Sequence, residues 1–272
     1  MQRTIFFVSD RTGITAETLG HSLLTQFDDI QFKSVNLPFI DSMDKAKQAV
    51  EQINVVSRRS HDRPIIFSTL VNQELREIVA RANAAFFDFF GAFIGPLEQE
   101  FNTKSSYAIG RSHGLVDNTV YGVRMDAVNF ALANDDGTTT RNYSKADIII
   151  IGVSRSGKTP SCLYLALQFG IYAANYPLTE EDLEGIQLPA IIRPYREKLY
   201  GLTIEPERLQ KIRHERRPDS PYSSLRQCQY ETRQAEAIFR AERIHYLSTT
   251  TLSVEEIATT LLASTGIERR LF

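Results

Sequence analysis

At 272 residues, with 42% hydrophobic and 24% charged residues, the chain has the composition of an ordinary globular protein of one large or two modest domains. Its formal net charge of −2 gives no general attraction to nucleic acid or to an anionic membrane, so we expect neither as a partner. The apolar runs fall short of the ~20 residues of a membrane span, and two cysteines form no disulfide framework, so we expect a cytoplasmic protein.

The first half of the chain alternates short β-rich runs with helical patterns. Residues 4–9 form an apolar run that ends in a polar turn. In the helix that follows, we expect Ile14, Leu19, Leu23 and Leu24 on the buried face. Further strands are predicted at residues 32–37 and 64–68, and further helices at 45–56, 72–84 and around 86–101. This alternation predicts an α/β domain with a largely parallel sheet.

A second α/β region follows a polar middle segment. Residues 102–123 are polar and punctuated by glycine, which is typical of a site loop. Helical spacing returns at 125–133, and we interpret Asn-Asp-Asp-Gly at 134–137 as a turn rather than a metal site. The boundary is expected near 135–145. This predicts an N-terminal α/β domain, residues 1–140, that contributes site loops, and a second α/β domain with a parallel sheet, residues 141–272.

The clearest motif follows the β-branched run at 148–151, which has the character of a buried parallel strand. Glycines let backbone amides turn inward around a phosphate, and the start of the next helix adds a favourable dipole. Lys158 would reach the terminal phosphates, and the Thr159 hydroxyl would ligate Mg²⁺. The motif G-x-x-x-x-G-K-T, a nucleotide-binding P-loop, comprises Gly152, Val153, Ser154, Arg155, Ser156, Gly157, Lys158 and Thr159.

A P-loop predicts nucleotide binding but not a particular reaction. A GTPase would need a base-selecting NKxD motif, which the sequence lacks. An ATPase would show an apolar strand ending in Asp or Asp-Glu. The nearest matches are Asp88, placed in an expected helix, and Asp10 after the first strand. These observations favour a kinase-like protein with unusual catalytic parts. Residues 141–272 are therefore expected to form a P-loop kinase-like domain.

Asp10 follows the first strand, where open α/β sheets place their ligand sites. It is a candidate catalytic base or Mg²⁺ contact, with Arg11, Thr12 and Gly13 lining a second phosphate pocket. Capping of the next helix by Asp10 or Thr12 explains the same residues.

Two groups of basic residues are further candidates. In the polar middle loop, Arg111 could clamp a phosphate and His113 could shuttle a proton, although these residues alone favour a surface loop with incidental charges. Arg213, Arg216 and Arg217 cluster beside a proline and could close over phosphates as an arginine lid. A solvated basic surface or a docking face for a protein substrate would look the same.

Seven stretches spread along the whole chain carry a specific resemblance: FVSDRTGITAETLGHSLLTQF, RSHGL, FALANDDG, IIGVSRSGKTPSCLYLALQFGIYAANYPL, KLYGLTIEPERLQKIRHERR, YSSLRQC and SVEEIATTLL. In them the chain resembles the pyruvate, phosphate/water dikinase regulatory protein family, closest to its members that regulate phosphoenolpyruvate synthase. The resemblance implies a bifunctional enzyme. It would phosphorylate a threonine of the synthase with ADP as donor, releasing AMP, and reverse this with inorganic phosphate, giving pyrophosphate.

The resemblance also favours His113 as a proton-transfer residue, and Asp10 stays the other candidate. The P-loop leads us to expect a divalent cation, Mg²⁺ or Mn²⁺. Whether the chain forms a homo-oligomer is left open by these motifs. Three alternatives remain at this point. The same chemistry could act on pyruvate, phosphate dikinase, the chain could be a non-catalytic nucleotide sensor that binds the synthase, or it could be a small-molecule kinase.

Overall fold

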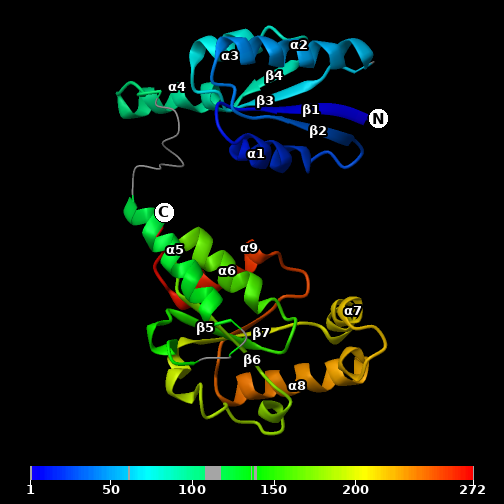
Figure 1. Ribbon diagram of the computed structural model, residues 1–272, viewed down its shortest axis with the longest axis vertical. Helices are drawn as coiled ribbons and strands as arrows, with labels where there is room; N and C mark the ends of the chain where they lie inside the picture. Colours follow the sequence, from blue (N-terminus) through cyan, green and yellow to red (C-terminus); the bar gives the residue numbers. More distant parts are fainter. Residues whose placement is uncertain (1, 61, 108–117, 136, 138–139, 272) are drawn as a thin grey trace. The chain divides into compact units, whose positions relative to one another are not determined.

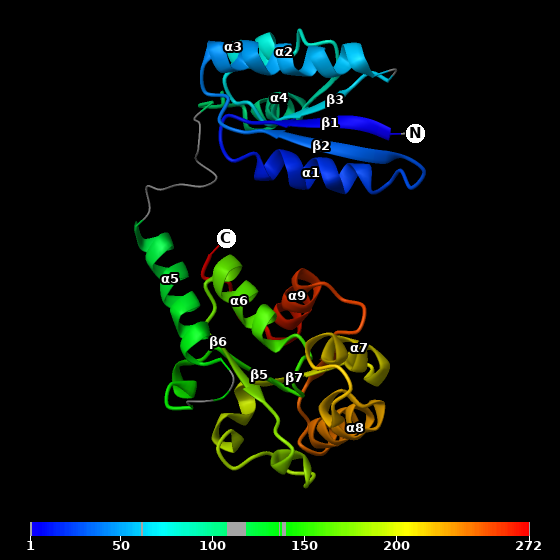
Figure 2. The same ribbon diagram turned by 45° about the vertical axis from the view of Figure 1, so that its right-hand side comes forward.

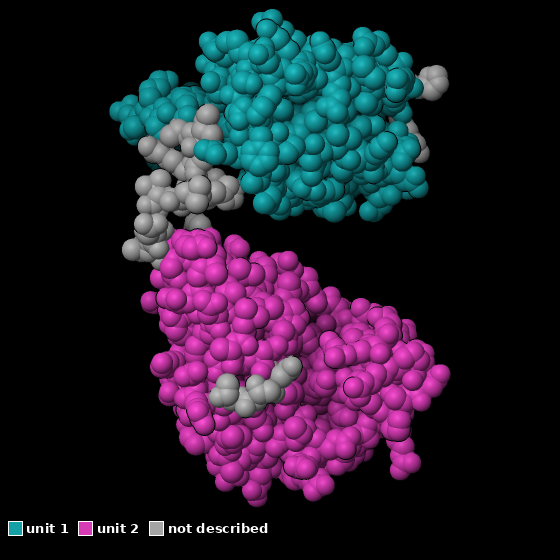
Figure 3. Space-filling model, in the orientation of Figure 1, with its two compact units in different colours: residues 1–114 teal, residues 115–272 magenta. Residues whose placement is uncertain are grey.

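The computed structural model describes residues 2–60, 62–107, 118–135, 137 and 140–271. The chain divides into two compact units, Met1–Gly114 and Leu115–Phe272, which Figure 3 distinguishes by colour. Within the described residues, each unit contains a four-stranded sheet whose neighbouring strands are all parallel. The predicted α/β class is therefore confirmed. No helix among the described residues is long and apolar enough to cross a membrane.

The first unit is a sheet of order β2-β1-β3-β4 with helices on both faces. Residues of α2 and α3 pack on one face, and residues of α1 and α4 pack on the other, as Figure 1 shows for α1, α2 and α3. This layering explains why β1 and β3 are apolar on both sides. The elements are β1 (Gln2–Val8), α1 (Ile14–Leu24), β2 (Gln31–Leu37), α2 (Met43–Arg59), β3 (Ile65–Ser68), α3 (Gln73–Val79), β4 (Ala85–Asp88) and α4 (Phe89–Phe101).

Helix α1 buries a different face from the predicted one. Its buried residues are Ala16, Gly20 and Leu24, whereas three of the expected core residues are exposed: Ile14, Leu19 and Leu23. A Cβ atom at Gly20 would lie 2.3 Å from the ring of Phe7. Small residues therefore face the sheet because the helix lies directly on the aromatic rings of the strands.

The segment expected as one helix around 86–101 is a strand followed by a helix. The short strand β4 pairs with β3, and Asp88 at its end caps α4 by accepting a hydrogen bond from the amide of Gly91 at 2.9 Å. The Asp88 carboxylate also pairs with Arg76 at 3.1 Å. Asp88 therefore does end an apolar strand, as the catalytic Asp of an ATPase would. Its contacts, however, are a helix cap and an ion pair within the first unit.

The second unit is a sheet of order β6-β5-β7-β8. Helices α5, α6 and α9 cover one face, and α7 and α8 pack against the other (Figure 2). The central strand β5 is buried along its full length. The helices and strands of the second unit are α5 (Asn118–Ala133), β5 (Ile148–Gly152), α6 (Lys158–Phe169), β6 (Ala173–Pro177), β7 (Leu199–Thr203), α7 (Pro206–Arg216), α8 (Leu225–Ala241), β8 (Tyr246–Ser248) and α9 (Val254–Thr265).

Helix α5 belongs to the second unit, so the division of the chain lies before the expected boundary near residue 140. Ala127 and Ala131 of α5 are buried in the same core as Ile148, Ile150 and Leu165. The change of composition after residue 133 marks a turn inside the second unit rather than a boundary between units.

Candidate functional site

The glycine-rich loop, residues 152–159, joins β5 to α6 at the carboxyl edge of the second sheet. Gly157 precedes α6 in the left-handed region, with φ of 92°. At Gly152, an added Cβ would lie 2.3 Å from the carbonyl oxygen of Leu202, so that only glycine fits there. Gly157 is the N-cap residue of α6 and has no side chain that could cap the helix. A helix start of this kind, wrapped by a glycine-bearing loop, is suited to an anion such as phosphate.

Lys158 is the first residue of α6, and only 5% of it is exposed. Its Nζ donates a hydrogen bond to the carbonyl oxygen of Val153 at 2.8 Å. The ammonium group therefore folds back across the loop from which it starts. The Lys158 ammonium group therefore lies beside the loop amides, where a phosphate group would need a positive charge.

The Thr159 hydroxyl donates to Asp135 Oδ1 at 2.8 Å. Asn175, in the middle of β6, donates to the same carboxylate oxygen and to Thr159 Oγ1, the latter at 3.0 Å. Asp135 lies in the segment that we interpreted only as a turn, and that interpretation missed its contact with the loop. Asp136 lies outside the described residues. A hydroxyl and a carboxylate thus meet at the start of α6.

Arg213 does not form part of an exposed arginine lid. It is fully buried in α7, and its guanidinium group forms an ion pair with Glu231 of α8. The same group donates to the carbonyl oxygen of Ser154 at 3.0 Å and stacks over the ring of Tyr222. Tyr222 also shares a 2.9 Å hydrogen bond with the Ser154 hydroxyl. Arg213 therefore stabilises the glycine-rich loop from the protein interior, through Ser154 and Tyr222.

The other two arginines of the expected lid are exposed at the end of α7. Arg216 is the last residue of the helix and Arg217 follows it. Neither lines the cavity described next. Their proposed phosphate contacts remain predictions.

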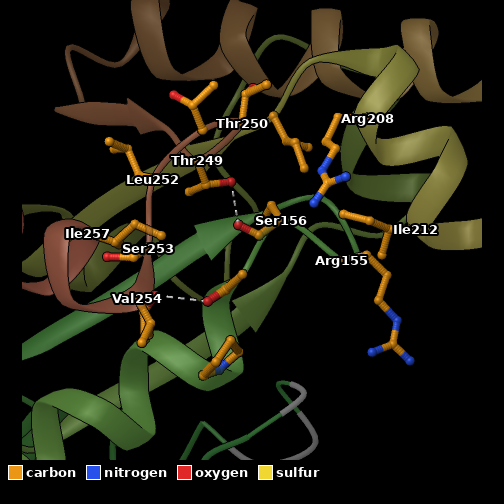
Figure 4. A pocket seen from close by; sticks show the side chains of 15 residues that line it. Arg155, Ser156, Arg208, Ile212, Thr249, Thr250, Leu252, Ser253, Val254 and Ile257 are labelled. Atoms are coloured by element: carbon orange, nitrogen blue, oxygen red, sulfur yellow. Dashed lines mark hydrogen bonds between the residues drawn. The ribbon is translucent and has the colours of Figure 1, made fainter. Parts of the chain in front are cut away.

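A cavity of about 430 Å³ opens beside the glycine-rich loop. Figure 4 shows Ser156 at its centre, with Arg208 and Ile212 on one side and Leu252 and Ile257 on the other. Its lining also includes the hydroxyl-bearing residues Thr249, Thr250, Thr251 and Ser253. Apolar walls with a few polar groups and nearby positive charge suit a nucleoside phosphate. Arg208, which the sequence did not single out, is the α7 arginine that faces this cavity.

Asp10 lies just beyond β1 in the first unit and is 6% exposed. Its Oδ2 accepts a hydrogen bond from the backbone amide of Val71 at 3.1 Å. The N-cap of α1 is Gly13, which has no side chain, so neither Asp10 nor Thr12 caps this helix. Arg11 and Thr12 are exposed. Arg111 and His113 lie outside the described residues, and their proposed roles remain predictions.

Burial raises the pKa of Asp10, and the hydrogen bond from Val71 offsets part of this effect. A carboxyl group with a raised pKa in the folded state favours folding most when it is protonated. Stability is then lost as the pH rises from about 3.9, the ordinary value, through the raised pKa. We therefore expect Asp10→Asn to melt at a higher temperature than the original chain at pH 7, with the difference vanishing toward pH 4. Thermal melts between pH 4 and 7 measure this.

Asp41→Asn is the matched control for this prediction. Asp41 belongs to the same unit, but its hydrogen bond with Lys45 lowers its pKa. Its replacement should give no gain in melting temperature at pH 7. A melting temperature for Asp10→Asn that does not exceed that of the original chain at pH 7 would contradict the argument from burial.

The fold and the loop together define a two-unit α/β protein whose second unit presents a helix start and a lysine suited to phosphate. Residues 5–262 match the Kinase/pyrophosphorylase family, and the chain belongs to this family. It is 58% identical over 271 residues to a protein of Alkalilimnicola ehrlichii named "Putative phosphoenolpyruvate synthase regulatory protein". That similarity covers 100% of this chain and 98% of the relative. A protein of the same name from Marinobacter nauticus is 56% identical, with 99% of each chain covered.

Proposed function

We propose that the chain is a cytoplasmic, bifunctional regulator of phosphoenolpyruvate synthase. It phosphorylates a threonine of the synthase with ADP, which inactivates the synthase, and removes the phosphoryl group with inorganic phosphate, which restores activity. The observation that carries the proposal is the glycine-rich loop with buried Lys158 beside a cavity of nucleoside size. Membership of the Kinase/pyrophosphorylase family supports the chemistry, and the names of the relatives support the target.

In the kinase direction, the threonine Oγ forms a bond to the β-phosphorus of ADP. The bond from that phosphorus to the bridging oxygen breaks, AMP leaves, and the hydroxyl proton passes to a base. The loop amides, Lys158 and Arg208 would stabilise the charge on the transferring group. Asp10 and His113 remain our candidates for the proton transfer.

In the reverse direction, an oxygen of inorganic phosphate bonds to the phosphorus of the phosphothreonine. The bond from that phosphorus to Oγ breaks, Oγ takes up a proton from the same acid–base group, and the products are pyrophosphate and the unmodified threonine side chain. One phosphate-binding loop can serve both directions because both transition states carry negative charge on the same transferring phosphoryl group. Mg²⁺ or Mn²⁺ would bind at the Thr159 hydroxyl and neutralise part of this charge. A second phosphate pocket at Arg11, Thr12 and Gly13 is compatible with this scheme.

The test incubates the protein with phosphoenolpyruvate synthase and β-labelled ADP, and locates the label by mass spectrometry. We expect label on a threonine and release of AMP, followed by release of pyrophosphate when inorganic phosphate is added. Transfer to pyruvate, phosphate dikinase instead would change the target. ADP binding without transfer to either protein would reduce the function to nucleotide sensing, and transfer to a metabolite would make the chain a small-molecule kinase.

A further inference from the structure

Three polar side chains from distant parts of the chain meet at the start of α6. Asp135 precedes β5, Thr159 is the second residue of α6, and Asn175 lies on the edge strand β6. The Asn175 amide nitrogen contacts both the Asp135 carboxylate and Thr159 Oγ1, which contact each other at 2.8 Å. The amide therefore fixes the positions of two oxygen atoms that belong to different segments.

The turn that carries Asp135 is held in place by its own contacts with β6. The backbone amide of Asn175 donates to the carbonyl oxygen of Asn134 at 3.1 Å. Asn134 is fully buried, and its side-chain amide donates to the carbonyl oxygen of Phe130 at 2.8 Å. Gly137 lies so close to β6 that an added Cβ would be 3.2 Å from Tyr176 and Pro177. Hydrogen bonds and close packing against β6 therefore fix the turn that carries Asp135.

The buried amide of Asn175 points to a role beyond folding. Asn175 is 1% exposed, and its Oδ1 atom has no hydrogen-bond partner within the described residues. A buried polar group without a partner destabilises the fold, so the presence of Asn175 at this position calls for a further explanation. Its contacts with Asp135 and Thr159 supply one, because they hold two potential ligands of a cation at one point.

The donor set suits a hard divalent cation. Mg²⁺ prefers oxygen ligands and is commonly bound by one or two carboxylates together with substrate phosphates. Many P-loop enzymes take the carboxylate from the end of a strand and the hydroxyl from the loop. The strands beside β5 end here in Pro177 and Thr203, neither of which is acidic. Asp135 places a carboxylate at the loop hydroxyl from a different part of the chain.

We propose that Asp135 and Thr159 hold the divalent cation of the nucleotide complex and that Asn175 is the positioning residue for both. The inference rests on the proposed function, because the remaining ligands would be phosphate oxygens of the nucleotide and water. It assigns to a turn before β5 the part that a strand-end acid plays in many related loops. The same assignment separates the cation site from the phosphate cradle of Lys158 and the loop amides.

The test measures metal and nucleotide binding separately in the full chain. Binding of Mn²⁺ in the presence of ADP is followed by the loss of the free Mn²⁺ signal in electron paramagnetic resonance, and ADP binding is titrated with EDTA present. We expect Asp135→Asn to weaken Mn²⁺ binding by about tenfold to hundredfold while its metal-free ADP affinity stays unchanged. Mn²⁺ binding as tight as that of the original chain would overturn the inference.

Two further variants complete the experiment. Asp126→Asn, an exposed acid on α5, is the matched control and should leave both affinities unchanged. Asn175→Ala keeps both ligands but removes the positioning amide, and should weaken Mn²⁺ binding by roughly tenfold. If Asp135→Asn does not fold, unchanged Mn²⁺ binding in Asn175→Ala overturns the inference on its own. Failure of the original chain to bind ADP would instead overturn the proposed function, and this inference with it.

Discussion

Lys158→Ala is expected to reduce phosphotransfer in both directions by about a hundredfold to a thousandfold, because removal of one preorganised donor to transition-state charge has effects of that size. The ammonium group is buried beside the glycine-rich loop, 2.8 Å from the carbonyl oxygen of Val153. In the Lys158→Ala variant, water cannot easily take over the role of the missing ammonium group at this buried position. The labelled-ADP assay and the release of pyrophosphate from phosphorylated synthase measure the two directions separately.

Lys211→Ala is the matched control for this variant. Lys211 is an exposed lysine of α7 in the same unit, so its loss removes an equal charge away from the loop. It should leave both rates unchanged. Retention of the phosphate-driven reaction in Lys158→Ala would show that the two directions do not share one cradle. Melting curves establish that the variant is folded, since the loss of a buried side chain can also lower stability.

The glycine-rich loop was predictable because all of its signals are contiguous. A buried strand, two glycines with special backbone positions, and a helix start occur within residues 148–169, and local sequence shows each of them. The capping box that Ser253 and Glu256 form at the start of α9 is another feature of this local kind. Where a feature depended on local propensity and short spacing, the sequence was sufficient.

Features that depend on distant partners could not be predicted in this way. Asp135 has the appearance of a turn residue, and only the fold brings it to Thr159, 24 positions later. Arg213 belongs to an arginine cluster that suggests a solvated lid, yet Glu231 on the next helix neutralises it inside the core. The prediction of the buried face of α1 was wrong because Gly20 approaches the sheet more closely than a larger residue could. Each case is a tertiary contact that outweighs a local pattern.

The buried ion pair of Arg213 and Glu231 should dominate the stability of the second unit. Burial alone would lower the pKa of Arg213, but the hydrogen bonds and charge of Glu231 raise it above its ordinary value. Glu231→Leu would leave that guanidinium charge buried without its partner. We expect a loss of about 3–5 kcal/mol, comparable to other broken buried pairs. For a unit of this size the melting temperature should fall by roughly 6–20 °C, which calorimetry measures.

The double variant Arg213→Met/Glu231→Leu separates stability from function. With both charges gone, apolar side chains of similar volume should recover most of the lost stability, so the two single effects should not add. The carbonyl oxygen of Ser154 would still lack the donor that holds it at 3.0 Å. We therefore expect ADP affinity to stay reduced by about tenfold or more in a folded protein. Full ADP affinity in the double variant would show that the pair stabilises the unit without positioning the glycine-rich loop.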